Sequence, residues 1–438
     1  MTTNLWLDHI EVIHTDTSFR EKWRGVIPIE KGFDFARQIT SNGNLYFIFY
    51  DRDFSDRSFV LYEVSLNQGT YNKFVVRNSI PFRPRVLEVT TLGAIIGGYF
   101  NRTPVVMFFE FSTQKSKILP GLLAEAGELT QVKINSDESF TVLISAKNYQ
   151  KQQTLWLKNY DPVGRLLRNF MLQPEDNNNL IFGRAIQTEN NSQIITGVYG
   201  NRNTEFSRGL FVARVTNDGV QQIKYYNYAD LENFFKYMRV KKEKRVKERI
   251  TRKKIKGKKI RFQYRFLVHE LVPYKNQFIL LGEAFYPRYR TIEGAYSMGA
   301  GRSQYIFDGY QYTHAVVLGI DANGTLLWDN SFEINDVKTF TLEQFVKMDA
   351  QKEKIALLYL YENNIRTKII QDSIVLEGKT SSQLTPNAAA VSRKGMGINK
   401  LDYWYGDYFL AYGVQDVDSP VLGRSKRKVF FVNKVSYE

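Results

Sequence analysis

The sequence contains no cysteine, which excludes disulfide bonds, thiolate nucleophiles and cysteine-ligated zinc or iron–sulfur centres. Only four of the 438 residues are histidines, and none has the spacing of a metal-binding motif. No apolar run approaches the ~18 residues of a membrane-spanning helix. Thr2 to Ile10 lacks the basic flank and apolar stretch of a signal peptide. We therefore expect no metal site and no membrane-spanning helix.

Catalytic signatures are also missing from the sequence. It has no Gly-x-Ser-x-Gly elbow, phosphate-binding loop or dinucleotide fingerprint. Asp321-Ala322-Asn323-Gly324 resembles the start of a calcium loop, but Phe332 stands where the bidentate glutamate is required, which favours a hairpin turn. We expect a protein that is not an enzyme and that needs no cofactor. A hydrolytic site built from carboxylates such as Asp51 and Asp53 remains an alternative.

Aromatic residues are abundant, with 27 Tyr, 31 Phe and 5 Trp making up 14% of the chain. These residue types favour the half-buried surfaces of β-sheets. Seven short apolar runs that end in polar turns recur along the chain, and four of the six spacings between them lie near 50 residues. The runs are Asn44 to Arg52, Ala94 to Arg102, Phe140 to Asn148, Gln193 to Arg202, Phe278 to Arg288, Lys354 to Asn364 and Tyr408 to Asp416.

Other strand-like runs flank most of these repeats, and glycine turns such as Asn217-Asp218-Gly219 separate later runs. Each repeat is therefore predicted to contain about four antiparallel strands. This pattern predicts an all-β fold, a seven-bladed β-propeller of four-stranded antiparallel blades that spans residues 1–438 as a single domain. A β-helix or two β-sandwich domains fit the period less well. Trp6 to Thr15 would complete the last blade and close the ring.

The excess of positive charge is confined to one segment. Sixty Lys and Arg against 45 Asp and Glu give a net charge of +15, but Lys236 to Arg265 holds 16 of the basic residues and only two acids. The rest of the chain is nearly neutral. Glu243 with Lys247, and Glu248 with Arg252, have the spacing of helical ion pairs, so Leu231 to Ile250 is predicted to be a helix. The glycine-containing stretch from Lys253 to Lys259 is predicted to be a turn.

Two long repeat spacings indicate insertions: a basic helical insertion at 221–262, between blades four and five, and a long loop at 287–311 in blade five. Propeller topology places both on one face, together with the linker from Gly378 to Gly397. We expect this face to bind a partner. The candidate partner-binding residues are Lys241, Lys242, Lys244, Arg245, Lys247, Arg249, Arg252, Lys253, Lys254, Arg288, Tyr289 and Arg290.

Several repeats also end with a tyrosine that is followed two or three positions later by an arginine. These residues could form a ring of binding groups on the same face, since aromatic residues and arginine are enriched at binding hot spots. The alternative is that each tyrosine ends a strand and each arginine is merely solvated. The residues are Tyr50, Arg52, Tyr99, Arg102, Tyr199 and Arg202.

The basic segment has four interpretations. Nucleic-acid binding is not expected, because the neutral remainder offers no continuation of a phosphate-binding surface. Binding to anionic membranes has only a weak apolar stripe to support it, which includes Phe234, Phe235, Met238 and Val246. Docking onto an acidic protein fits the clustered insertions. A solvated helix without a partner is the fourth possibility.

The segment from Arg265 to Ile369 resembles a propeller group of Bacteroidota cell envelopes. The resemblance is carried by Phe266 to Thr291, Phe307 to Val337 and the lysine-rich segment upstream, about a quarter of the chain. A soluble propeller rich in tyrosine and lysine is similar to the plug subunits of the type IX secretion translocon. The resemblance implies a periplasmic location and a role in closing an outer-membrane protein-secretion channel.

That resemblance implies a monomer within a hetero-complex, which associates with the membrane only peripherally and has a translocon barrel as its large protein partner. Two alternatives remain open on the residues alone. One is a glycan-binding or hydrolytic propeller that uses the mouth of its central channel. The other is binding of nucleic acid or an anionic surface through the basic segment.

Overall fold

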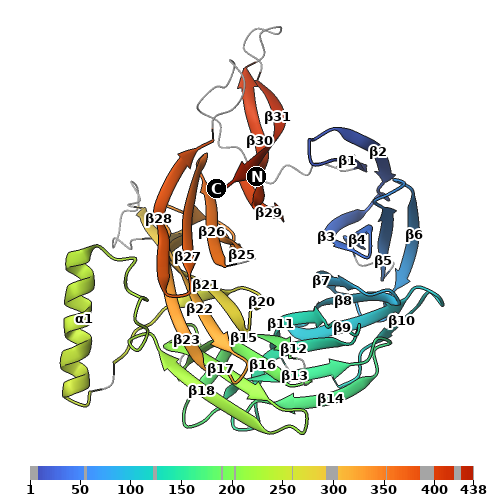
Figure 1. Ribbon diagram of the computed structural model, residues 1–438. Helices are drawn as coiled ribbons and strands as arrows, with labels where there is room; N and C mark the ends of the chain where they lie inside the picture. Colours follow the sequence, from blue (N-terminus) through green and yellow to red (C-terminus); the bar gives the residue numbers. More distant parts are fainter. Residues whose placement is uncertain are drawn as a thin grey trace, which may run out of the picture. The chain divides into compact units, whose positions relative to one another are not determined.

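The computed structural model describes residues 8–437, with gaps at 54–56, 122–125, 189–190, 202–203, 259, 293–303, 352, 385–398 and 419–425. As the repeats predict, the chain is a seven-bladed β-propeller of antiparallel sheets with a basic helical insertion (Figure 1). It divides into two compact units, Met1–Gln187 and Thr188–Glu438.

The first unit contains a two-stranded hairpin, three four-stranded sheets and the first strand of a fourth. The hairpin is formed by β1 (His9–Thr15) and β2 (Glu21–Pro28). The sheets are formed by β3 (Phe33–Ser41), β4 (Asn44–Asp51), β5 (Ser58–Ser65) and β6 (Tyr71–Arg77); by β7 (Arg83–Val89), β8 (Gly93–Phe100), β9 (Thr103–Glu110) and β10 (Lys115–Ile118); and by β11 (Gly127–Ile134), β12 (Phe140–Lys147), β13 (Gln153–Tyr160) and β14 (Leu166–Met171), with β15 (Asn179–Gln187) after them.

The second unit contains the remaining sheets and helix α1. The fourth sheet has the order β15-β16-β17-β18, and the seventh has three strands. The elements are β16 (Gln193–Gly200), β17 (Gly209–Val215), β18 (Gln221–Asn227) and α1 (Val240–Ile255); β19 (Arg265–Val268), β20 (Val272–Tyr274), β21 (Gln277–Ile292), β22 (Gln304–Asp321), β23 (Leu326–Glu333) and β24 (Lys338–Thr339) of the fifth sheet; β25 (Lys347–Gln351), β26 (Lys354–Tyr361), β27 (Asn364–Gln371) and β28 (Ile374–Gln383) of the sixth; and β29 (Asn399–Tyr405), β30 (Tyr408–Asp418) and β31 (Lys426–Ser436) of the seventh.

The seven apolar runs seen in the sequence are the second strands of the seven sheets: β4, β8, β12, β16, β21, β26 and β30. Where side chains are described along β8, β16 and β26, nearly all are buried, on both faces of the strand. A strand covered on both faces reads as a continuous apolar run instead of an alternating one. This explains why the second strands carry the repeat signal.

The predicted glycine turns are present between the later strands. Gly219 and Gly324 have φ values of +87° and +75°, which L-residues with a side chain rarely adopt. In the second turn, the Asp321 carboxylate accepts hydrogen bonds from the backbone N–H groups of Asn323 (2.9 Å) and Thr325 (2.6 Å). The stretch that resembles a calcium loop is therefore a side-chain-stabilised hairpin turn.

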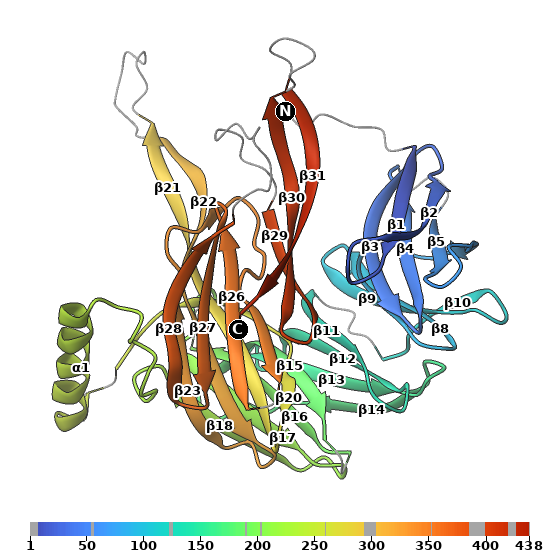
Figure 2. The same ribbon diagram turned by 45° about the horizontal axis from the view of Figure 1, so that its top comes forward.

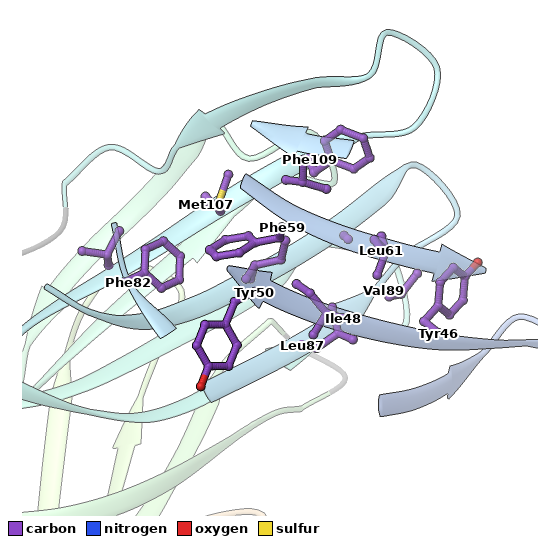
Figure 3. Packing of buried hydrophobic residues seen from close by; sticks show 14 residues of the cluster. Tyr46, Ile48, Tyr50, Phe59, Leu61, Phe82, Leu87, Val89, Met107 and Phe109 are labelled. Carbon is purple, nitrogen blue, oxygen red and sulfur yellow. The ribbon is translucent and has the colours of Figure 1, made fainter. Parts of the chain in front are cut away.

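Packing between neighbouring sheets provides the core of each unit. In the first unit, Ile48 and Leu61 of the first sheet are fully buried against residues of the second sheet such as Phe109 (Figure 3). Aromatic rings fill much of this core, and Phe59 and Phe82 meet edge to face with centroids 5.1 Å apart. Such pairs contribute about 0.5–1.5 kcal/mol beyond the burial of their surface.

The N-terminal strand differs from the prediction. Its described part, β1, pairs antiparallel with β2 in a separate hairpin and does not supply a strand to the three-stranded seventh sheet. The turn at Asp16 favours this hairpin, since the Asp16 carboxylate accepts hydrogen bonds from the N–H groups of Ser18 and Arg20. The indole N–H of Trp23 then joins the hairpin to Leu66 at the end of the first sheet.

The bounds of both insertions also need correction. The stretch 221–227 is the fourth strand of its sheet, and the helix spans 240–255, so it begins nine residues later and ends five residues later than predicted. Residues 287–292 and 304–311 continue the β21–β22 hairpin as strands instead of forming a loop. Of the linker from Gly378 to Gly397, 378–383 belongs to β28, and 385–397 lies outside the described residues.

Candidate interaction surface

Helix α1 gathers nine of the predicted partner-binding residues on one element. Its 16 residues include only two acids, Glu243 and Glu248. The carboxylate of Glu243 lies 2.7 Å from the ammonium of Lys247, one turn further on. Basic residues fill the last turn, where they interact favourably with the negative end of the helix dipole. The nine side chains are exposed except for Lys253, which is half-buried.

The apolar residues of α1 do not form a face that could enter a membrane. Val246 is half-buried and Ile250 is only 8% exposed, so these two side chains, one turn apart, are covered by the protein itself. Val240 and Ile255 are about 80% exposed, but they lie at opposite ends of the helix. An interfacial helix needs a continuous apolar stripe along its length. The exposed surface of α1 is cationic instead.

A cluster of rings holds the insertion against the fifth sheet, and we call it the aromatic anchor. It consists of Tyr228, Phe234, Tyr237, Tyr264, Phe266 and His314. The first three precede α1, Tyr264 and Phe266 follow it, and His314 lies in β22. Tyr228 stacks on Phe234 with centroids 4.6 Å apart, and Phe234 meets the imidazole of His314 edge to face at 5.0 Å. Both ends of the insertion are thereby fixed to the sheet.

Hydrogen bonds to Asp329 of β23 fix the same segment. The carboxylate accepts from the backbone N–H groups of Glu232 (2.9 Å) and Asn233 (2.7 Å), and the Asn233 amide donates to the Asp329 carbonyl. Burial raises the pKa of Asp329, and the two N–H groups act against that rise. At the other end of the helix, the ammonium of Lys254 lies 2.8 Å from the Asp230 carboxylate. The segments that flank the helix are therefore held in place by hydrogen bonds and an ion pair.

The remaining predicted partner-binding residues lie on a second structure, the aromatic ribbon, which comprises residues 286–292 of β21 and 304–310 of β22. Here the hairpin extends beyond its sheet (Figure 2). Tyr289 pairs with Phe307 and Thr291 with Tyr305, so these four side chains share one face. Phe340 adds to the cluster, its ring centroid 6.5 Å from that of Phe307.

These rings are unusually accessible: Tyr289 is 60% exposed, Phe340 69% and Tyr305 72%. Arg288 and Arg290 add exposed positive charge, and the Asp308 carboxylate lies 4.0 Å from the Arg288 guanidinium. Exposed aromatic clusters next to arginine are typical of protein-binding surfaces. Figure 2 shows the tip of the ribbon well apart from α1. The predicted partner-binding residues therefore form two surfaces of the second unit.

The predicted ring of tyrosines consists largely of core residues. Tyr50 and Tyr199 are each only 8% exposed. The guanidinium of Arg83 lies 5.3 Å from the ring centre of Tyr50, and Tyr199 packs edge to face on Tyr225. The hydroxyl of Tyr99 accepts a hydrogen bond from the N–H of Leu129 at 2.9 Å. Tyr50 and Tyr199 thus serve packing, and the Tyr99 hydroxyl serves a structural hydrogen bond.

The arginines of that ring behave as turn residues where they are described. Arg52 forms an ion pair with the Asp34 carboxylate at 2.5 Å, within its own sheet. Arg102 is exposed and has a positive φ of +66°. Arg202 lies outside the described residues. Tyr50, Tyr99 and Tyr199 are too buried or too engaged to act as binding groups, so the interpretation of the ring as a binding surface is not supported at those three positions.

Sequence reasoning missed three exposed residues of the aromatic ribbon and its surroundings, Tyr305, Ile306 and Phe340. The available signal was the share of aromatic and β-branched residues in 286–292 and 304–310, which is typical of strands. Within the described residues, no group of three or more His, Asp or Glu is placed to hold a metal ion. The helix of the described chain is also too short and too polar to cross a membrane.

No protein-family model matches the sequence, and no curated protein matches it either. Among solved structures, the β-propeller domain of the Trilobed protease from Pyrococcus furiosus has a TM-score of 0.43 at 9% identity, covering 93% of this chain and 98% of that one. The polysaccharide lyase Uly1 has a TM-score of 0.45 at 8% identity, covering 92% and 89%.

Acylaminoacyl peptidase from Pyrococcus horikoshii has a TM-score of 0.42 at 8% identity, over 90% of this chain. The present chain spans only about half the length of that peptidase, 52%. Identities this low concern the fold alone, so the chemistry of these enzymes is not carried over to this protein.

Proposed function

We propose that this protein is a non-enzymatic interaction propeller that binds an acidic protein partner through helix α1. The observation that carries the proposal is the rigid mounting of the cationic helix. The aromatic anchor and Asp329 fix the base of the insertion, while at least eight basic side chains of α1 project into solvent. A pre-ordered charge array loses little conformational entropy on binding and speeds association with a partner of opposite charge.

The aromatic ribbon supports the proposal as a second contact. Its apolar and aromatic surface would contribute binding free energy. The charge of α1 would orient the partner as it approaches and increase the rate of association. A large partner that reaches both surfaces would gain from the two contacts acting together, because the second contact becomes intramolecular once the first has formed.

We further propose that the partner is an outer-membrane protein-secretion channel, which this chain closes from the periplasmic side. The support is the resemblance of Phe266 to Thr291 and Phe307 to Val337 to the plug subunits of the type IX translocon. Both stretches lie in the fifth sheet and its connections, and they include most of the aromatic ribbon. The proposed periplasmic location and peripheral association with the membrane follow from the same resemblance.

The test is purification of tagged protein from its own cells in mild detergent, with identification of the co-purifying proteins. Changing Lys241, Lys242, Lys244 and Arg245 together to Gln removes four charges from α1 with little effect on helix propensity. We expect loss of the co-purifying channel barrel. The control variant changes Lys22, Lys31, Lys115 and Lys151 to Gln, which removes the same amount of charge from exposed sites in the first unit. This variant should still co-purify with the channel barrel.

Equal retention of the barrel by both quadruple variants would remove α1 from the proposed function. Co-purification of other proteins without any outer-membrane barrel would overturn the channel proposal. A duplex DNA probe serves as a further check. Tight binding that weakens steeply with salt and depends on α1 would favour the nucleic-acid interpretation instead.

A further inference from the structure

A half-open cavity of about 260 Å³ lies between the sixth and seventh sheets, and it plays no part in the proposed interaction. It is formed by Lys347 of β25 and the residues just before that strand, by β29, and by single residues of β26 and β30. Leu360 and Leu401 line its apolar side and are 3% and 4% exposed. Both belong to the packed core between these two sheets, so this side of the cavity is rigid.

The polar side of the cavity is an ordered chain of three side chains. The ammonium of Lys347 lies 2.9 Å from one carboxylate oxygen of Asp402, and the hydroxyl of Tyr412 donates a hydrogen bond of 2.6 Å to the other. Burial and the neighbouring carboxylate raise the pKa of Tyr412, so its phenol keeps its proton. Lys347 retains further N–H donors and Asp402 retains further lone pairs, which are available to a ligand in a fixed arrangement.

We propose that this cavity binds one unit of a neutral saccharide. Its charged lining residues balance, since it is lined by two cations, Lys347 and Lys400, and by two carboxylates, Asp402 and Glu343, so neither a cation nor an anion is favoured. Hydroxyl groups both donate and accept hydrogen bonds, which suits a lining that mixes donors with acceptors. The C–H face of a sugar ring suits the leucine side chains and the ring of Phe345, which also lines the cavity.

The size and the ion pair narrow the choice of ligand. Drug-sized ligands occupy pockets of ~300–1,000 Å³, so a cavity just below this range fits a single ring. A zwitterion such as a free amino acid also carries balanced charge, but binding it through Lys347 and Asp402 would require breaking their existing ion pair. A sugar hydroxyl can bridge the same pair without separating it.

The experiment is saturation-transfer NMR on the full chain with methyl α-glucopyranoside, cellobiose and N,N′-diacetylchitobiose as neutral probes, and with glucuronate and glutamate as charged ones. We expect transfer to at least one neutral sugar and not to the charged probes. Tyr412→Phe removes one hydrogen-bonding group while keeping the ring, and should weaken that binding about 3- to 10-fold.

Tyr405→Phe is the matched control, because the Tyr405 hydroxyl lies in the same sheet and accepts a hydrogen bond from Lys434, away from the cavity. It should bind the sugar as well as the unmodified chain does. Absence of transfer to all three sugars, transfer to the charged probes alone, or equal binding by the Tyr412→Phe variant would each overturn the proposal. The quadruple α1 variant should still bind sugar, which separates this test from that of the proposed function.

Discussion

The imidazole of His314 stacks on the phenol ring of Tyr237, with the ring centroids 3.7 Å apart and the planes 4° from parallel. His314 is fully buried, and its Nδ1 atom shares a hydrogen bond of 2.9 Å with the Thr313 hydroxyl. Within the described residues its other ring nitrogen has no hydrogen-bond partner. A neutral ring suits this site, and a charged one does not.

Acid should therefore destabilise the second unit through His314. Burial lowers the pKa of His314 to about 3, whereas an unfolded chain has a histidine pKa near 6.5. Below that value the unfolded state binds a proton that the folded state excludes. The free energy of unfolding should then fall by up to about 1.4 kcal/mol for each pH unit between 6.5 and 3. Urea unfolding measured across this pH range checks the slope.

His314→Phe should keep the stacking on Tyr237 and remove this part of the pH dependence. His9→Phe is the matched control, because the His9 side chain is 55% exposed in the first unit. An identical acid slope in the His314→Phe variant and the unmodified chain would show that another group causes the loss of stability.

Much of the blade architecture could be predicted from the sequence, because the middle strands are buried on both faces. Runs such as Ala94 to Arg102 and Lys354 to Asn364 are apolar along their middle residues and polar only near their ends, and their spacing reveals the blades. The residues that attach the ends of the basic insertion to the fifth sheet could not be predicted from the apolar pattern. Tyr228 and Phe234 appear in the sequence as ordinary aromatic residues, and only the fold brings them to His314.

The candidate interaction surface was predicted in part for similar reasons. The charge of α1 is a local property, so its basic residues could be named, although the start of the helix could not. The segment from Leu231 to Arg239 lacks glycine and proline, but its buried contacts with Asp329 and the fifth sheet override helix formation there. Tyr50 and Tyr199 are buried and therefore cannot contact a partner. A single sequence gives no measure of burial at a strand end, so this could not be predicted.

Removing the Asp329 carboxylate should loosen the base of α1. Asp329→Ala leaves the buried N–H group of Asn233 without its acceptor, and such losses cost about 1–3 kcal/mol for each group. We expect faster tryptic cleavage within 240–255, where lysine and arginine are frequent, with little change in the melting of the first unit. Asp321→Ala, in an exposed turn of the same sheet, should not accelerate cleavage of the helix. Unchanged cleavage in Asp329→Ala would show that the aromatic anchor suffices alone.

Glu283 should be a stability determinant of the fifth and sixth sheets. Its side chain is fully buried, and its carboxylate accepts hydrogen bonds from the N–H groups of Phe345 and Val346 and lies 2.6 Å from His269 Nε2. Glu283→Gln places an amide donor among these groups and should lower the free energy of unfolding by about 3–5 kcal/mol. Urea titration of the variant and the unmodified chain measures this loss of unfolding free energy. Glu377→Gln, at an exposed position of β28, should cost less than about 0.5 kcal/mol, and equal effects of the two changes would contradict this role.

The core of the first unit gives a prediction that is independent of α1. Leu61 is fully buried between the first two sheets, next to Ile48 and Phe109 (Figure 3). Leu61→Ala removes three carbon atoms and leaves a cavity that close-packed neighbours fill only in part, which should cost about 2–5 kcal/mol. Leu167→Ala, at a position 60% exposed in β14 of the same unit, should cost less than about 1 kcal/mol. Chemical denaturation of both variants tests the packing, because equal losses would mean that the neighbours of Leu61 collapse into the space or that the sheets do not meet there.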